Sequence, residues 1–228
     1  MSESQFYYSW NVKDPSPGKS KGIMFENAKW KNHEISISFL DGNEEIKKIV
    51  EEKAKMWTKQ ANGPANLSFS FRKNTNNTLI RISFEGKGNW STVGTTCRFN
   101  NDNSRPTMNL GGLSSKVSNE YIQGVVLHEF GHVLGLLHEH QSPASPIKWN
   151  SKRIFEDLSG PPNNLTYDEI YENVIKIFET EPKNHTDFDK DSIMIYPIPK
   201  IWLLEGNSIN ANYQLSKMDI EFIRKQYP

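Results

Sequence analysis

The chain has 228 residues, which is enough to bury a sizeable core as a single domain with two lobes around a cleft. It carries 27 basic and 27 acidic residues, so no net charge draws it toward nucleic acid or an anionic membrane surface. Its apolar runs are all shorter than the roughly 20 residues of a membrane-spanning helix. We therefore expect no nucleic-acid partner and no membrane span, and the sequence does not indicate an oligomeric state.

The N-terminal region has the composition of a loop, with Pro15, Pro17 and several lysines close together. Residues 1–10 lack the basic start and apolar core of a secretory signal peptide. We expect a chain that is exported by another route or whose leader is not part of this sequence, with a cytosolic location as the alternative. Residues 1–20 are interpreted as an N-terminal extension, and residues 21–228 as one domain.

The next part of the chain alternates between strand-like and helix-like patterns. Ile35 and Ile37 alternate with serines, as in a strand with one face buried. Apolar residues at helical spacing predict a helix over 44–60. The alternation seen in the first strand recurs and predicts strands at 67–71 and 79–84, and residues 107–110 are a further short strand candidate that ends at two glycines.

Three helices are predicted in the C-terminal half, with looser structure after the first of them. Ser118 is a good N-cap for a helix through the histidine-rich segment that follows it. Thr166 and Glu169 have the spacing of a capping box, and we expect a helix from there to about Phe178. Ser216 can cap a last helix. Strands and helices in this order predict an α+β fold.

The segment 128–138 contains three of the six histidines, at a spacing that suits a catalytic zinc site. His128 and His132 are four residues apart, so on an α-helix both imidazoles face the same side. Zinc binds neutral imidazole nitrogen, and catalytic sites use three protein ligands with water in the fourth position. Glu129, beside the first ligand, is placed to take a proton from that water as a general base. We therefore expect one catalytic Zn²⁺ ion.

The third candidate ligand, His138, comes too late in the chain to share the helical face of His132. The chain must turn between them, and Gly135 can supply the turn because glycine accepts positive φ and commonly ends helices. The apolar residues around the histidines also fit a buried amphipathic helix whose histidines are structural. The two interpretations are compatible, since a zinc helix must pack on a core.

Two motifs together resemble a known family. The segment Ser192–Pro197 follows the histidine motif and is similar to the Met-turn of the metzincin metalloproteases, whose zinc motif has the same form. The tyrosine two residues after Met194, Tyr196, resembles the motif of the astacin family within that clan. The glutamate directly after His138, Glu139, resembles the zinc motif of the same family. The resemblance covers most of the chain.

The resemblance implies a metzincin-like zincin fold, with a twisted N-terminal sheet, two helices and an irregular C-terminal lobe around a zinc cleft. It implies that Met194 forms an apolar floor under the zinc and that Tyr196 is a fifth ligand, which swings away to stabilise the oxyanion. Glu139 matches the family glutamate that receives the new N-terminal amine once a prosegment, here residues 1–20, is removed. The strand 107–110 is expected to be the sheet edge with which an extended peptide pairs.

The expected activity is that of a zinc metalloendopeptidase that hydrolyses extended protein or peptide substrates. The alternatives are a zinc-binding domain that holds peptides without cutting them, and a toxin or effector protease with one narrow target. A single cysteine excludes the intrachain disulfides of animal astacins, which places the chain with divergent microbial members. Cys97 is interpreted as a buried thiol, with a zinc-blocking thiolate as the alternative.

Overall fold

The computed structural model of the chain describes residues 26–31, 34–59, 66–73, 78–114, 116–161, 163–178 and 186–228. The interpretation of residues 1–20 as an extension falls outside these residues. The helices of the described part are α1 (Glu44–Ala54), α2 (Asn119–Val133), α3 (Ser151–Ser159), α4 (Tyr167–Ile170) and α5 (Lys217–Gln226). Together with one sheet they form the predicted α+β fold. Within this part of the chain, no helix combines the length and apolar character needed to cross a membrane.

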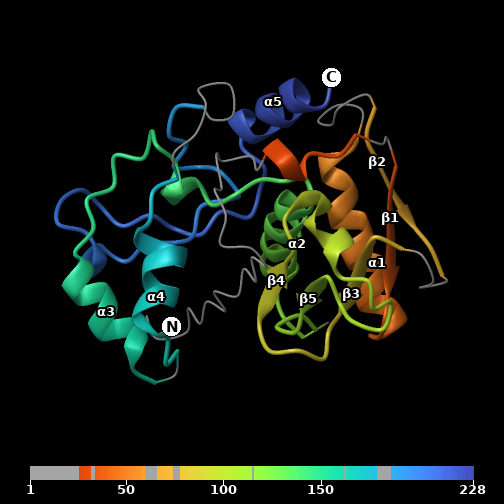
Figure 1. Cartoon of the computed structure of the whole chain (residues 1–228), viewed down its shortest axis with the longest axis horizontal. Coiled ribbons are helices and arrows are strands. Elements are labelled where there is room, and N and C mark those ends of the chain that lie inside the picture. Colours follow the sequence, from red (N-terminus) through yellow and green to blue (C-terminus); the bar gives the residue numbers. More distant parts are fainter. Residues whose placement is uncertain are drawn as a thin grey trace.

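A five-stranded sheet forms one side of the molecule, with α1 and α2 beside it (Figure 1). Its strands are β1 (Glu34–Phe39), β2 (Ser68–Phe71), β3 (Ile80–Ser83), β4 (Asn89–Ser91) and β5 (Met108–Leu110). Their order across the sheet is β2-β1-β3-β5-β4, and only β4 runs antiparallel to its neighbour. The prediction that the strand at 107–110 forms the sheet edge was therefore wrong. The edge beside β5 is β4, whose three residues follow a glycine-containing turn and are too few to show alternation.

Strand β1 is buried on both faces, whereas its sequence pattern predicted one exposed face. Ser36 and Ser38 are buried, like the neighbouring Ile35 and Ile37. The Ser38 hydroxyl bonds to the Thr78 hydroxyl at 2.6 Å, and Ser36 Oγ accepts from Leu79 N at 3.1 Å. The segment that enters β3 thus covers the serine face, because short hydroxyls can be buried once they are hydrogen-bonded.

Helix α1 is shorter than predicted and is fixed to α2 at its end. Its N-cap is Asn43, whose Oδ1 accepts from Ile46 N at 2.9 Å. The helix tightens into a 3₁₀ turn over Lys55–Trp57 instead of continuing to residue 60. At that point Trp57 Nε1 donates to Leu127 O at 2.9 Å, which ties the end of α1 to the middle of α2. The two helices and the sheet enclose the main hydrophobic core.

Helix α2 is the central element of this core. It begins after Ser118, whose Oγ accepts from Tyr121 N at 3.2 Å as the predicted N-cap. Its last turn is held from both ends of the described chain. Trp30 Nε1 donates to Val133 O at 2.6 Å, and the Tyr227 hydroxyl donates to Leu134 O at 2.8 Å. These bonds fix the position of the histidine-bearing end of the helix.

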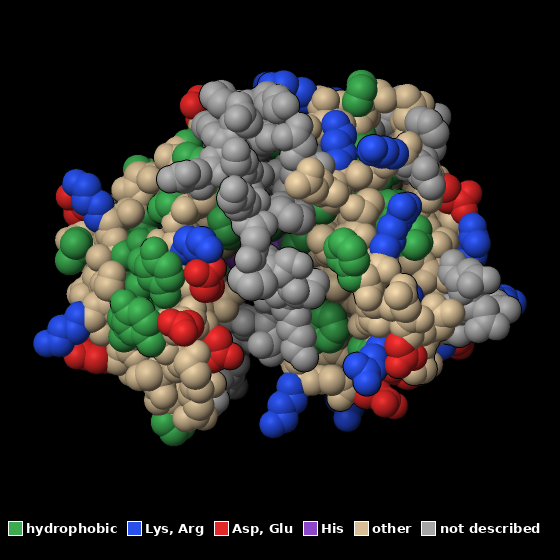
Figure 2. Space-filling model, viewed as in Figure 1, with side chains coloured by type: hydrophobic (Ala, Val, Ile, Leu, Met, Phe, Trp, Pro, Cys, Tyr) green, Lys and Arg blue, Asp and Glu red, His purple; other side chains and the backbone are tan. Residues whose placement is uncertain are grey.

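The C-terminal lobe has a separate, smaller core. It is formed by side chains from α3, α4 and the irregular segments that follow, namely Ile154, Leu158, Ile170, Val174, Ile198, Trp202 and Leu203. The predicted capping box of Thr166 and Glu169 is present, and the helix continues as one π-helical turn only to Ile175. It therefore ends three residues before the predicted Phe178. Figure 2 shows exposed hydrophobic side chains over this lobe, and charges of both signs intermingled on the visible face.

Cys97 is a buried thiol, as its isolation in the sequence predicted. Only 1% of its surface is exposed. Burial raises the pKa of this thiol to about 11, although the nearby arginines Arg98 and Arg81 favour the thiolate. The side chain is therefore a neutral thiol at pH 7, whereas a metal-binding cysteine has to be a thiolate.

Candidate metal centre

The turn after α2 brings the third histidine back toward the first two. Gly135 has a φ of +92°, in the left-handed region that glycine adopts without strain. Leu136 N donates to Gly131 O at 3.0 Å, and Gly135 N donates to His132 O at 2.8 Å. This pair of bonds is the Schellman motif, which satisfies the last carbonyls of a helix and reverses the chain. The reversal predicted between His132 and His138 is therefore present at Gly135.

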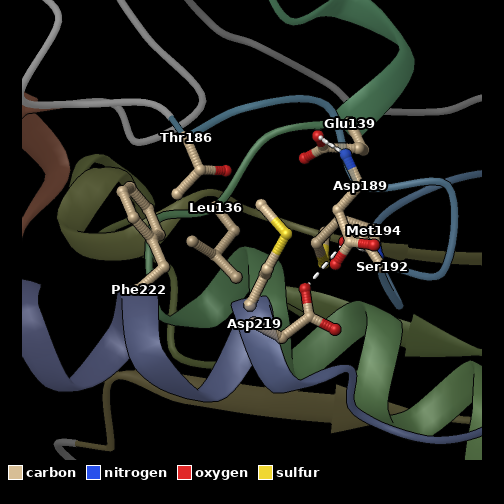
Figure 3. A pocket seen from close by; sticks show the side chains of 9 residues that line it. Leu136, Glu139, Thr186, Asp189, Ser192, Met194, Asp219 and Phe222 are labelled. Carbon is tan, nitrogen blue, oxygen red and sulfur yellow. Dashed lines mark hydrogen bonds between the residues drawn. The ribbon is translucent and has the colours of Figure 1, made fainter.

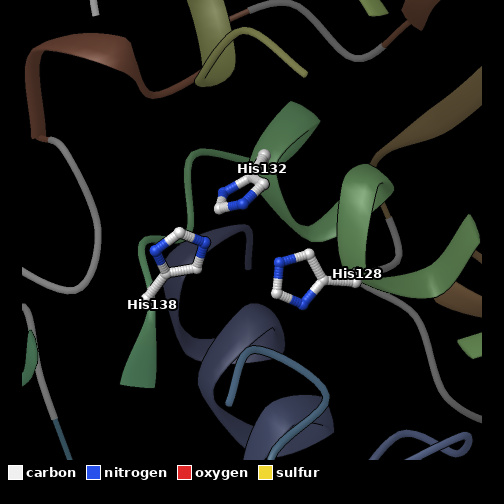
Figure 4. Close-up of side chains that lie close together, drawn as sticks. All are labelled: His128, His132 and His138. Carbon is white, nitrogen blue, oxygen red and sulfur yellow. The ribbon is translucent and has the colours of Figure 1, made fainter. Parts of the chain in front are cut away.

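The three predicted ligands form one cluster (Figure 4). One ligand nitrogen from each of His128, His132 and His138 lies within 4.8 Å of the others, and all three residues are buried. The centroids of the imidazole rings are 4.8–5.4 Å apart. The two rings on α2 face the same side because they are four residues apart, as the sequence pattern predicted.

Backbone carbonyls determine which nitrogen of each α2 histidine is available. His128 Nδ1 lies 2.8 Å from Ile193 O, and His132 Nδ1 lies 2.8 Å from Leu136 O. A carbonyl oxygen can only accept, so each Nδ1 carries the proton and each Nε2 keeps its lone pair. Carbonyl or carboxylate partners of this kind hold metal-ligating histidines in the correct tautomer.

The electrostatics of the cluster favour neutral imidazole. Burial lowers the pKa of His128 to about 4. Burial and then the neighbouring His128 lower the pKa of His132 to about 3. Burial and then the neighbouring histidines lower the pKa of His138 well below its usual value. All three rings are therefore neutral at pH 7, which is the form that binds a metal ion.

The residues of the cluster fit a zinc ion. The Nε2 atoms of His128 and His132 are buried and have no hydrogen-bond partner in the part of the chain that the structure describes. An unpaired buried polar atom lowers the stability of the fold by about 1–3 kcal/mol, so these lone pairs are expected to bind a ligand. Three converging neutral imidazoles are the donor set that zinc takes in catalytic sites, with a fourth position left to water or substrate.

Glu129 is a buried carboxyl beside the first histidine. It is 4% exposed, and its Oε2 has no hydrogen-bond partner among the described residues. Burial raises the pKa of this carboxyl to about 8. A divalent cation close by would lower that pKa, because positive charge favours the carboxylate. The group is therefore suited to exchanging a proton near neutral pH.

Tyr196 and Met194 both lie close to the α2 residues of the motif. The Tyr196 ring centroid is 4.9 Å from that of His128 and 4.5 Å from that of His138. Met194 is buried, and its sulfur packs directly on Gly131, one residue before His132. A Cβ at position 131 would overlap that sulfur, so the glycine makes room for Met194. Sequence patterns alone could not have assigned this role to Gly131.

Glu139 lies at a small cavity of about 20 Å³ that is also lined by Asp189 and Asp219 (Figure 3). Its Oε1 accepts from Asp189 N at 2.9 Å. Burial and then the neighbouring carboxylates of Asp219 and Asp189 raise the pKa of Glu139 to about 8. Among the described residues, no lysine or arginine forms an ion pair with these three acids. The cavity has room for about one water-sized group.

His140 belongs to the surroundings of the metal centre, although sequence patterns could not place it. It is fully buried, and its ring stacks on that of His138 with 5.3 Å between centroids. Its Nε2 lies 3.2 Å from Asn173 O, and Trp149 packs edge-on against it at 5.9 Å. His140 therefore connects the third histidine to the C-terminal lobe. Its only sequence signal was its position two residues after His138.

Comparisons with known proteins agree with this geometry. Residues 22–228 match the family model of Astacin, a family of peptidases. A structure of myroilysin superposes with a TM-score of 0.82 at 29% identity, covering 90% of this chain and 98% of that one. A crystal structure of myroilysin gives a TM-score of 0.66 at 30% identity, covering 88% and 86%. None of the curated protein sequences matches this chain.

A more distant match shows the fold alone. High choriolytic enzyme 1, a hatching enzyme zinc-protease from the medaka fish Oryzias latipes, superposes with a TM-score of 0.56 at 18% identity, covering 89% of this chain and 95% of that one. The family match extends over both lobes and includes the histidine cluster. The chain therefore belongs to the astacin family of peptidases, and it is a zinc metalloendopeptidase.

Proposed function

We propose that the chain hydrolyses peptide bonds of extended protein substrates with Glu129 as the general base. The observation that carries this proposal is the buried carboxyl of Glu129 next to three converging imidazoles. His128, His132 and His138 would hold the zinc. When bound, the ion supplies Lewis-acid chemistry, which lowers the pKa of water and polarises a carbonyl.

The role of Glu129 follows from its position and its burial. Its carboxylate accepts a proton from the water that attacks the scissile carbonyl and then delivers it to the leaving amine. The unpaired Oε2 supports this role, because it is not engaged by other described residues. Removal of solvent around the carboxyl also strengthens its interaction with the water it activates.

Tyr196 is proposed to stabilise the oxyanion through its phenolic hydroxyl. Its ring lies against His128 and His138, within reach of a substrate carbonyl at the centre. We expect Tyr196→Phe to lower kcat by about 10²–10³-fold, as removal of one oxyanion donor typically does. KM and zinc content should change little, because the aromatic ring remains. Steady-state kinetics on a fluorogenic peptide, with metal analysis, measure this; an unchanged kcat would contradict the role.

The edge strand β4 supports an extended substrate. On either side of β4, Gly88 O accepts from Gly111 N at 3.1 Å and Thr92 N donates to Thr107 O at 2.9 Å, so these main-chain groups face β5. In an antiparallel ladder the hydrogen-bonding side alternates along the strand, so the main-chain groups of Asn89 and Ser91 face outward. Ser91 is buried, so a peptide could pair as an added strand with the main-chain groups of the half-buried Asn89.

The buried acids beside Glu139 support the interpretation of residues 1–20 as a prosegment. Glu139, Asp189 and Asp219 are among the residues that line a cavity with room for one ammonium group, and the N-terminal amine exposed near residue 21 or 22 would provide it. We expect a chain trimmed to that point to cleave casein about 5–150-fold faster than one starting at Met1. This factor corresponds to the typical coupling free energy between two sites of a protein. Glu139→Gln in the trimmed chain should remove the gain. Equal rates for the two chain lengths would contradict the interpretation.

A panel of unrelated unfolded proteins separates this function from its alternatives. Cleavage of many members would support a general endopeptidase. Cleavage of none, with zinc bound to the trimmed chain, would favour a peptide-binding domain or a protease with one narrow target. No described feature favours the peptide-binding domain, because binding alone requires neither a buried carboxyl at Glu129 nor the ring of Tyr196.

A further inference from the structure

We propose that Asp219 is a positioning residue of the metal centre, which orients His128 through the backbone of Ile193. The proposal rests on His128 being a zinc ligand, and it does not depend on the role of Glu129. It assigns a functional contribution to α5, which contributes no candidate ligand or catalytic group.

The carboxylate of Asp219 connects the first turn of α5 to the loop that contains Met194. Its Oδ1 accepts from Ser192 Oγ at 2.7 Å, the bond drawn in Figure 3. Its Oδ2 accepts from Ile193 N at 2.9 Å and from Ser216 N at 2.9 Å. The side chain is only 7% exposed, so these donors replace most of its hydration. A single carboxylate thus holds two consecutive residues of the loop.

Ile193 is bonded to Asp219 through its N–H and to the metal centre through its carbonyl. Ile193 N is held by Asp219, and Ile193 O accepts from His128 Nδ1 at 2.8 Å. The preceding peptide is fixed as well, because Asn212 Nδ2 donates to Ser192 O at 3.1 Å. Ser192 Oγ in turn accepts from Met194 N at 3.0 Å. The carbonyl that orients His128 therefore lies in a loop that α5 and Asn212 hold in place.

The two α2 histidines differ in this dependence. His132 bonds to Leu136 O, which the turn at the end of its own helix places beside it. His128 bonds to a carbonyl 65 residues away along the chain, which no local structure could place. Of these two histidines, His128 therefore requires a long-range anchor, and Asp219 supplies one. A histidine that loses its carbonyl partner can rotate or change tautomer, which weakens metal binding.

A second capping box in the chain shows what capping alone requires. Glu169 occupies the position in α4 that Asp219 occupies in α5, and both accept from the N-cap backbone. Glu169 is exposed, and its carboxylate bonds to the backbone and hydroxyl of Thr166. Asp219 is buried and also bonds to Ser192 and Ile193. Its burial and its extra bonds exceed what a helix cap needs.

The test compares Asp219→Ala with Glu169→Ala in the full chain, by chelator competition for zinc. We expect Asp219→Ala to weaken zinc binding by about 10–100-fold, the usual effect of removing an outer partner of a ligand. Glu169→Ala removes an equivalent cap and should leave zinc affinity unchanged. Asp219→Asn should recover most of the affinity, because its oxygen can accept from Ile193 N and its amide can donate to Ser192 Oγ.

A second measurement separates positioning from a general loss of stability. In the zinc-loaded protein, NMR should show faster solvent exchange of the Nδ1 proton of His128 in Asp219→Ala, with that of His132 unchanged. If Asp219→Ala does not fold, Ser192→Ala replaces it in both measurements. We then expect smaller changes in the same direction, namely weaker zinc binding and faster exchange at His128. Wild-type zinc affinity and wild-type exchange at His128 in whichever variant folds would overturn the proposal.

Discussion

Glu129→Gln is expected to lower kcat/KM for peptide hydrolysis by about 10⁴-fold, the upper end of what one general acid–base group contributes. The substitution keeps the shape of the side chain and removes its ability to take a proton. Zinc content should stay at the wild-type level, because the three histidines are untouched. Initial rates on a fluorogenic peptide, together with metal analysis of the same sample, measure both quantities.

The matched control for this variant is Glu120→Gln. Glu120 lies in the first turn of the same helix and is exposed, so the same chemical change is made away from the cluster. Its activity and zinc content should match those of the wild type. A Glu129→Gln variant that retained a tenth or more of wild-type kcat/KM would contradict the role of Glu129 as base.

His132→Ala is expected to remove both zinc and activity. The variant leaves two of three ligands, and catalytic zinc sites depend on three. We expect kcat/KM to fall by about 10³-fold or more, since the Lewis acid supplies several kcal/mol of transition-state stabilisation and each 1.4 kcal/mol is about tenfold. Metal analysis after dialysis and initial rates of peptide cleavage provide the measurements.

The wild-type protein treated with a chelator is the control for the histidine variant. Added zinc should restore the chelated wild type and leave His132→Ala inactive, while circular dichroism checks that the variant is folded. Stoichiometric zinc in His132→Ala after dialysis would show that the metal is held elsewhere. That outcome would contradict the assignment of the cluster.

Local signals predicted much of the structure. Ser118 begins α2, and Gly135 ends it, because a hydroxyl N-cap and a left-handed glycine act within a few residues of sequence. The convergence of His128 and His132 follows from helical spacing alone. The two helix caps in the C-terminal half, at Thr166 and Ser216, were recognisable for the same reason.

Features that depend on distant pairing could not be predicted. Strand β4 has three residues and becomes a sheet edge only because β5 lies beside it. His140 is buried because the C-terminal lobe supplies Asn173 O and Trp149, both of which come later in the chain. Asp219 has the sequence signature of a helix cap and nothing that indicates its bond to Ile193. In each case the deciding partner lies outside the local pattern.

The central claim is that the chain is a zinc-dependent endopeptidase that uses the cluster of His128, His132 and His138. Its most direct test is the initial rate of casein cleavage by the purified chain, trimmed to begin at residue 22, before chelation, after chelation and after zinc is restored. We predict cleavage that is lost on chelation and returns with zinc. Casein cleavage that continues at the same rate after the zinc has been removed would contradict the claim.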